Sequence, residues 1–183
     1  MDSTIQASFE NLLSKNKDLQ YEAYNHILAS TNEEVDWAYD VWDQLKLDLT
    51  HSDNHRRSRA AQFLCSLAKS DPEKRMLEDF PLVWEVTKDK KFVTARHSLQ
   101  SIWKIGLAST EQKEMVIRSF VDRYLNCVHE KNYTLIRFDI IQGLRNLFNE
   151  IKDDEIKQIA LDLVEKEEDA KYQKKYAAVW KNT

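Results

Sequence analysis

The chain has 183 residues, of which 32% are charged and 42% hydrophobic, and its formal net charge is −4. Only 2 glycines and 2 prolines are present. Because tight turns and phosphate-binding loops depend on these residues, the composition argues against a β-rich or loop-rich fold. The hydrophobic content is that of a globular chain, not a disordered one. No stretch approaches the roughly 20 apolar residues that a transmembrane helix needs.

The chain start and the cysteines bear on the compartment. The opening stretch, MDSTIQASFENLLSK, has neither a basic leader nor an apolar run, so we expect no signal peptide. Cys65 and Cys127 lie far apart within helical patterns and are interpreted as reduced thiols. These features predict a cytoplasmic protein.

Apolar residues recur at helical spacing along the whole chain, and this pattern predicts ten helices in five antiparallel pairs. The first helices of the pairs are expected at 4–15, 32–50, 71–88, 109–130 and 153–167. The second helices are expected at 18–30, 53–69, 91–108, 132–150 and 169–181. We therefore predict an all-α fold with a single domain over 1–183, built from repeats 1–30, 31–70, 71–108, 109–150 and 151–183.

Two of the predicted helices begin with residues typical of helix N-termini. Asp71 precedes Pro72, which places a capping side chain ahead of a proline in the first turn. Ser109 and Gln112 have the spacing of a capping box. Pro81 falls inside the third first helix and is expected to kink it.

A repeating frame appears in the second helices. Arg57, Arg96 and Arg137 are each followed by apolar or small residues three, six and seven positions later. Gln20 and Gln173 begin the same frame, and the five markers are spaced by 37, 39, 41 and 36 residues. A near-constant period of this length predicts stacked helix pairs, each of which buries its apolar face against its neighbours.

With HRRSRAAQFLCSLA, VTARHSLQSIWKIG and LIRFDIIQGLRNLF in its second helices, the chain resembles the HEAT-like (armadillo-type) repeat family. The family's second helix begins with a small or apolar residue and an arginine, and becomes rich in alanine and leucine. The period is short for that family, and the terminal repeats carry glutamine in place of arginine. A tetratricopeptide array would need a tighter period of about 34 residues. The resemblance implies an α-α superhelix whose second helices line the concave side.

Charge separates the two sets of helices. The first helices with their loops carry a net charge of −14, and the second helices carry +10. If the second helices lie inside, as the resemblance implies, the concave wall is basic and the outside acidic. A basic groove favours an anionic partner, either an acidic protein segment or nucleic acid. The alternative is that these charges pair between neighbouring helices.

Helical geometry predicts which second-helix residues face a partner. Positions one, five, eight and twelve residues after each marker point away from the buried stripe. The cations and the one aromatic residue on this ridge are the predicted ligand-binding residues, with Phe138 as an apolar anchor. They are Lys69, His97, Lys104, Phe138, Arg145 and Lys174.

The marker arginines themselves lie at the edge of the buried stripe. HEAT-like repeats join their neighbours through a ladder of turn acids and second-helix arginines, so the resemblance implies a bracing role for Arg57, Arg96 and Arg137. Ligand contact is the alternative role. The acids in the preceding turns are Asp53, Asp89 and Glu130.

Two weaker signals bear on chemistry. His51, Asp53 and His55 are residue types that ligate metals, but a helix end explains them as well, and we expect no metal or other cofactor. Trp37 and Asp40 give a fainter resemblance to the HEAT-like alkylpurine DNA glycosylases, which hold a damaged base with tryptophan and aspartate in a basic cleft.

No familiar catalytic motif is found, and no catalytic residue is predicted. The sequence favours a non-enzymatic HEAT-repeat scaffold that holds an anionic partner, most readily an acidic protein segment, in a basic concave groove. The alternative is a DNA-binding or alkylation-repair-like protein. No membrane partner is expected, and the oligomeric state is left open.

Overall fold

The structure is a computed structural model that describes residues 1–181. Within that range the chain forms ten α-helices and no β-strand, so the predicted all-α fold is confirmed. The helices are α1 (Ser3–Asn11), α2 (Lys17–Ser30), α3 (Ala38–Asp48), α4 (Asn54–Leu67), α5 (Arg75–Val86), α6 (Phe92–Leu99), α7 (Thr110–Asn126), α8 (Tyr133–Ile151), α9 (Asp154–Glu165) and α10 (Ala170–Ala178). Three short 3-10 segments, η1 (Ala68–Ser70), η2 (Ile102–Leu107) and η3 (Cys127–His129), follow α4, α6 and α7. None of these helices has the length and apolar character needed to cross a membrane.

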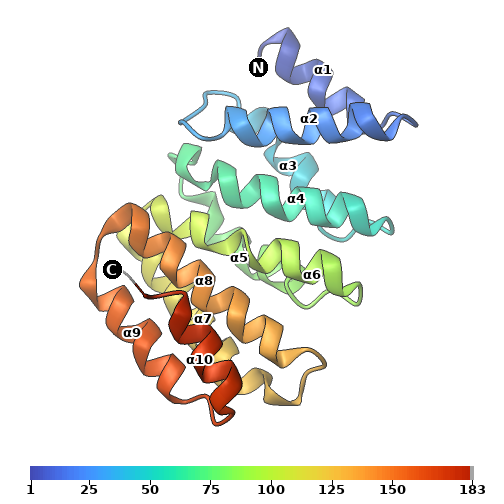
Figure 1. The fold of residues 1–183 in the computed structure, drawn as a ribbon. Coiled ribbons are helices and arrows are strands. Elements are labelled where there is room, and N and C mark those ends of the chain that lie inside the picture. The colour runs from blue at the N-terminus through green and yellow to red at the C-terminus, as the bar shows by residue number, and fades with distance from the viewer. Residues whose placement is uncertain (182–183) are drawn as a thin grey trace.

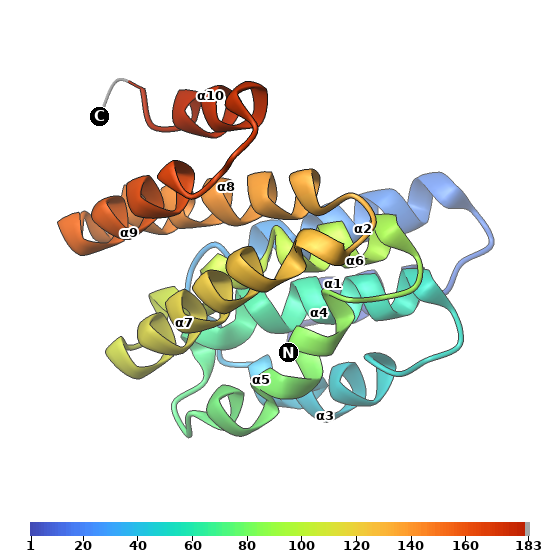
Figure 2. The ribbon, with the colours of Figure 1, turned by 90° about the horizontal axis from the view of Figure 1, so that it is seen from below.

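Consecutive helices pack as pairs, and the pairs stack along the molecule. The helices α2, α4, α6 and α8 lie one beneath another at the front of Figure 1, with α3, α5 and α7 behind them. Figure 2 shows the same two layers from below, with α10 beyond α8. We call the surface formed by α2, α4, α6, α8 and α10 the second-helix face.

Helix α4 is the most enclosed element of the stack. It packs against α2, α3, α5 and α6, and every side chain from Arg57 to Leu67 except Arg59 is buried. Cys65, Ser58 and Gln62 are therefore covered, although the periodicity placed them on the outward ridge. The apolar periodicity identifies the face that a second helix packs against its partner first helix. It does not identify the surface that neighbouring second helices cover.

The pairing of Gly143 with Phe120 shows how the core compensates for a change of side-chain volume. Gly143 stands six residues after its marker, where α4 has the fully buried Phe63. A Cβ atom at Gly143 would lie 3.0 Å from the ring of Phe120, a buried residue of α7. The ring from the first helix thus fills the space that the second helix leaves open.

The predicted helix at 91–108 is interrupted. Helix α6 ends at Leu99, and the chain continues into the 3-10 segment η2, which packs against α4, α7 and α8. A 3-10 helix advances about 120° per residue and an α-helix about 100°. Residues after Ser101 are therefore rotated out of the frame that Arg96 begins. Trp103 is partly exposed at the edge of the core, and Lys104 is half-buried.

Two first helices begin later than predicted. Helix α3 starts at Ala38, and α5 starts at Arg75 after a turn that contains Pro72. Asp71 still caps α5, because its carboxylate accepts the N–H groups of Arg75 at 3.0 Å and Met76 at 2.7 Å. The turn requires a left-handed backbone at Lys74, whose φ is 56°.

Candidate binding groove on the second-helix face

Each marker arginine is bound to an acid of the following helix pair. The Arg57 guanidinium donates to both carboxylate oxygens of Asp89, at 2.5 and 3.0 Å, and to the carbonyls of His51 and Ser52. Arg57 thereby joins α4 to the turn between α5 and α6. The pair is almost entirely buried, so neither charge is available to a ligand without breaking the other's contact.

The other two marker arginines find different acids. Arg96 makes a bidentate pair with Asp139 of α8 at 2.7 and 2.8 Å, and Arg137 binds Glu167 before α10 at 2.8 Å. Of the turn acids singled out by their spacing, Glu130 instead binds Arg123 of its own pair. Asp53 caps α4 by accepting the His55 N–H at 2.8 Å.

Proton affinities follow from these contacts. Burial disfavours the charged form of Asp89, but hydrogen bonds from Arg57 and from the Lys91 N–H outweigh it and lower the pKa of this carboxyl. The hydrogen bond to Asp139 likewise raises the pKa of Arg96. The raised pKa of Arg57 and the lowered pKa of Asp89 keep that pair ionised at neutral pH.

Cations of the first helices and their turns are also neutralised between pairs. Lys46 binds Asp79 at 2.6 Å, and Arg75 binds Asp43, so two ion pairs join α3 to α5. The same layer is joined further along by Lys74–Glu111 and Lys113–Asp153. These four ion pairs join successive first helices to one another.

The predicted ridge does not form one continuous surface. Lys104 donates to the Ser66 hydroxyl at 2.9 Å, and burial lowers the pKa of its amine. Lys69 donates to the Asn32 carbonyl at 2.8 Å. Both cations therefore hold neighbouring elements together, contrary to the prediction that they face outward freely.

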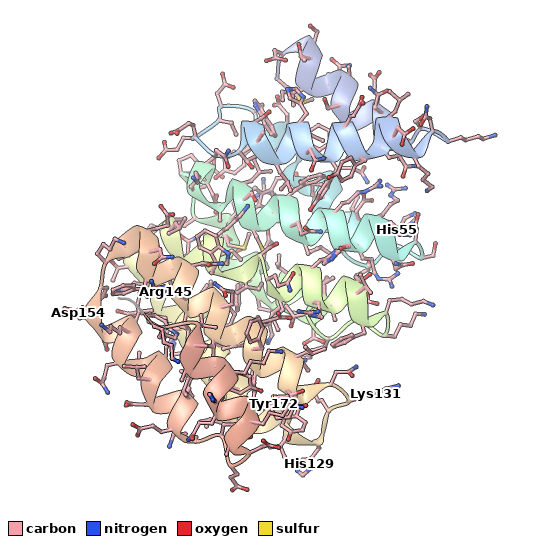
Figure 3. All side chains as sticks on the ribbon, viewed as in Figure 1. His55, His129, Lys131, Arg145, Asp154 and Tyr172 are labelled. Carbon is pink, nitrogen blue, oxygen red and sulfur yellow. The ribbon has the colours of Figure 1, made fainter. Side chains whose placement is uncertain are left out.

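Phe138 and Arg145 are partly covered by the last helix pair. The Phe138 ring lies beside Tyr176, with the Lys175 amine 4.7 Å from its centroid. The Arg145 guanidinium stacks on Phe148 and on Trp180, 5.1 Å from the latter ring. Lys174 is exposed on α10. Figure 3 shows Arg145 and His55 at opposite edges of the molecule.

His97 is the predicted residue that lies in a hollow of the second-helix face. A groove of about 410 Å³ runs across α2, α4 and α6 at this point. We call it the tyrosine–histidine groove, and its lining residues are Lys17, Gln20, Tyr21, Tyr24, His55, Ser58, Arg59, Gln62 and His97.

Arg59 is the central cation of this groove. Its guanidinium donates to the Leu12 carbonyl at 3.1 Å and to the Gln20 side chain at 2.9 Å. No carboxylate of residues 1–181 lies within ion-pair distance of it. Burial lowers the pKa of Arg59, and attraction to the nearby Asp53 carboxylate offsets this effect only in part. The Arg59 guanidinium thus forms no direct ion pair with a described residue.

The remaining groove residues surround this charge with exposed aromatic and titratable groups. Tyr21 is 67% exposed, and both His55 and His97 are open to solvent. The Tyr24 hydroxyl donates to Gln62 at 2.6 Å, which fixes the ring. Tyr21, Tyr24 and Arg59 escaped the sequence prediction because they lie beside the ridge. The cluster of basic residues at the start of α4, HRRSR, was a signal in the sequence for Arg59.

Neither weaker chemical signal assembles into a site. The His51 ring nitrogen accepts the Asp53 N–H at 3.0 Å, and within residues 1–181 no three His, Cys, Asp or Glu side chains are grouped to hold a metal ion. Trp37 is buried against Phe9. Asp40 is exposed and binds the amino group of Met1 at 2.9 Å. The tryptophan–aspartate pair of the glycosylase resemblance is thus not reproduced.

Comparison with known proteins does not assign the chain to a family. No protein-family model matches the chain, and the search of curated proteins found no match. The class defined here is accordingly one of architecture: an all-α stack of helix pairs with a cationic groove across three of its second helices.

Proposed function

We propose that the protein is a non-enzymatic, HEAT-like repeat scaffold that binds an anionic protein segment in the tyrosine–histidine groove. The observation that carries this proposal is Arg59, a half-buried guanidinium bonded only to neutral groups among the described residues. A cation in such a place gains free energy when a carboxylate or phosphate approaches it.

The surroundings of Arg59 favour an extended protein segment as the partner. The groove crosses three stacked helices, and Lys17, His55 and His97 add positive or titratable groups along it. The exposed Tyr21 offers an amphipathic ring, a residue type enriched at protein interfaces. A stack of helix pairs also presents such a surface without having to fold on binding.

The test is a charge reversal that spares the core. A His55→Glu/His97→Glu variant should bind a fluorescein-labelled polyglutamate peptide at least about tenfold more weakly than the wild type, because two cationic or neutral groups become anionic. Fluorescence anisotropy at pH 6.5 measures this affinity. Two exposed residues outside the groove, in His129→Glu/Lys166→Glu, provide a control that adds at least as much negative charge. Equal weakening in both variants would refute a role for the groove.

Nucleic acid is the second candidate partner, and one observation favours it. The exposed Tyr21 ring next to Arg59 could stack a base while cations contact phosphates. Binding of single-stranded DNA or RNA would then weaken steeply between 50 and about 200 mM salt, because phosphate contacts release counterions. Steep salt dependence that disappears in the His55→Glu/His97→Glu variant would establish this alternative over the protein segment.

We also propose a cytoplasmic location. Cys65 and Cys127 are free and buried, and burial raises the pKa of the Cys65 thiol to about 12. Such inert thiols are typical of proteins in reducing compartments.

A further inference from the structure

A second hollow lies at the turns, on the other flank of α6 from His97. It occupies about 290 Å³ between the α5–α6 turn and the α7–α8 turn. We call it the turn pocket. Its apolar wall consists of Phe92, Ala95, Leu99 and Ile136.

The rim of the turn pocket is cationic. Lys88, Lys90, Lys131, Arg96 and Arg123 surround the apolar wall. The two rim acids are already engaged, because Asp89 is bound by Arg57 and Glu130 by Arg123.

Lys90 and Lys131 keep their charge free. Neither has a carboxylate within ion-pair distance among residues 1–181. Figure 3 shows Lys131 reaching outward from the α7–α8 turn, on the same edge of the stack as His55. The rim therefore presents uncompensated positive charge to solvent.

Arg123 of the rim also has a hydrogen-bond donor without an acceptor among residues 1–181. Its side chain is 93% buried, and one terminal nitrogen binds Glu130 at 2.8 Å. Its Nε–H group is buried without a hydrogen-bond acceptor in the described part of the chain. An unpaired buried donor is costly, so an acceptor brought into this pocket would recover free energy if the guanidinium turns toward it.

We propose that the turn pocket is a second docking site, which takes one bulky apolar side chain from an acidic peptide segment. The volume of about 290 Å³ lies just below the range of ligand pockets, about 300–1,000 Å³, so it suits one side chain and not a folded surface. The apolar wall buries the anchor, and the free lysines complement acidic residues that flank it.

This site is separate from the tyrosine–histidine groove. Helix α6 contributes Arg96 to the turn pocket and His97 to the groove, so the two sites share a helix but no lining residue. The proposal does not depend on what the groove binds. A single extended partner that reached both sites would gain affinity from their linkage.

The experiment uses two synthetic peptides and the full chain. One peptide has acidic residues on both sides of a central phenylalanine, and the other has serine in place of phenylalanine. Titrations followed by amide NMR detect weak binding and report its location. The phenylalanine peptide should shift the amides of Phe92, Lys90 and Lys131, and should bind about tenfold or more tightly than the serine peptide.

A charge-reversed rim should weaken this interaction. Lys90→Glu/Lys131→Glu alters two exposed residues and is expected to reduce affinity for the phenylalanine peptide by about tenfold. Lys157→Glu/Lys166→Glu, at one position on α9 and one directly after it, makes the same change of charge away from the pocket and should leave affinity within about twofold. The His55→Glu/His97→Glu variant should retain the NMR shifts at Phe92, which separates this site from the groove.

Several results would overturn the proposal. Equal affinity for the two peptides would show that the apolar wall is not an anchor. Equal affinity for a basic peptide with the same phenylalanine would remove the role of the rim. Concentration-dependent dimerisation lost in Lys90→Glu/Lys131→Glu would make a second copy of the chain the occupant, and DNA-induced shifts confined to this pocket would make it a nucleic-acid site.

Discussion

Buried arginine–carboxylate pairs are the contacts by which single residues hold the stack together. Arg57–Asp89, Arg96–Asp139 and Arg137–Glu167 each link one helix pair to the next. The carboxylates are nearly excluded from water in all three. Such pairs add little net stability when intact, but they are expensive to leave half-complete.

Removal of Asp89 should therefore be severe. Asp89→Ala leaves the Arg57 guanidinium buried without its carboxylate, and we expect the free energy of unfolding to fall by about 3–5 kcal/mol. Urea denaturation followed by circular dichroism measures the change. Asp43→Ala removes an exposed acid from its pair with Arg75 and should cost no more than about 1 kcal/mol. Similar losses in the two variants would contradict the bracing role.

Asp89 also predicts how stability depends on pH. Hydrogen bonds with Arg57 and Lys91 lower its pKa below the ordinary value of 3.8 despite burial. Its stabilising contribution is fully present above that ordinary value and is lost as the pH falls through the lowered pKa. Between pH 5 and about 2, the unfolding free energy should decline less steeply in Asp89→Asn than in the wild type. Parallel declines would show that other carboxyls control acid unfolding.

At the scale of elements, neighbouring helices fit together through side chains of complementary size and through a local change from α-helix to 3-10 helix. Gly143 of α8 admits the Phe120 ring of α7, and η2 replaces the last turns of the predicted third second helix. Gly106 in η2 is similarly close to α8, since a Cβ there would lie 3.1 Å from Leu147. Packing between pairs thus determines where a helix can continue.

A large side chain at Gly143 should test this packing. Gly143→Leu improves helix propensity by about 1 kcal/mol, but it forces a buried ring aside, and overpacking costs about 1–3 kcal/mol or more. We expect net destabilisation of about 1–2 kcal/mol. Asn149→Leu, at an exposed site of the same helix, should change stability by less than about 0.5 kcal/mol. Thermal and urea unfolding measure both changes. A neutral Gly143→Leu variant would show that the Phe120 ring can move aside without cost.

The helices could be predicted because their signals are local. Apolar periodicity and capping residues predicted each of the ten helices, whereas the break at Gln100 depends on contacts of η2 with α4, α7 and α8. The same limit applies to the groove. Periodicity located His97 on an open face, but it could not show that Lys104 reaches Ser66 or that Arg59 lacks an acid. These facts depend on residues nearly forty positions away.

At the scale of the whole molecule, burial and charge are distributed unevenly. Helix α4 is enclosed by neighbours, whereas α1 and α10 lie at the two ends of the stack (Figure 1). Ion pairs join successive first helices, and exposed cations such as Lys90 and Lys131 remain at the turns of the second-helix face. The uneven burial affects how local stability varies along the stack. The location of the exposed cations affects the side from which an anionic partner approaches.

Hydrogen exchange should reveal the gradient of stability. Amides of α4 should exchange most slowly, because opening them requires several neighbouring elements to separate. Amides of α1 and α10 should exchange by local fraying, since each contacts the stack from one side only. Mass spectrometry of proteolytic fragments, corrected for intrinsic exchange rates, provides the comparison. Uniform protection of α1, α4 and α10 would indicate a single cooperative unit.

The carboxylates that bind the marker arginines come from different positions in successive helix pairs. This difference limits how the chain could gain or lose a helix pair. Arg57 forms its ion pair with Asp89, in the turn between the two helices of the next pair. Arg96 instead binds Asp139, which lies on a helix two residues after the next marker. The residue at that position in the last pair is Lys175. Excision of the fourth pair would therefore turn a lysine toward Arg96 in place of an aspartate. The helix pairs are therefore not interchangeable, because each marker arginine needs a carboxylate at a particular position of the pair that follows it.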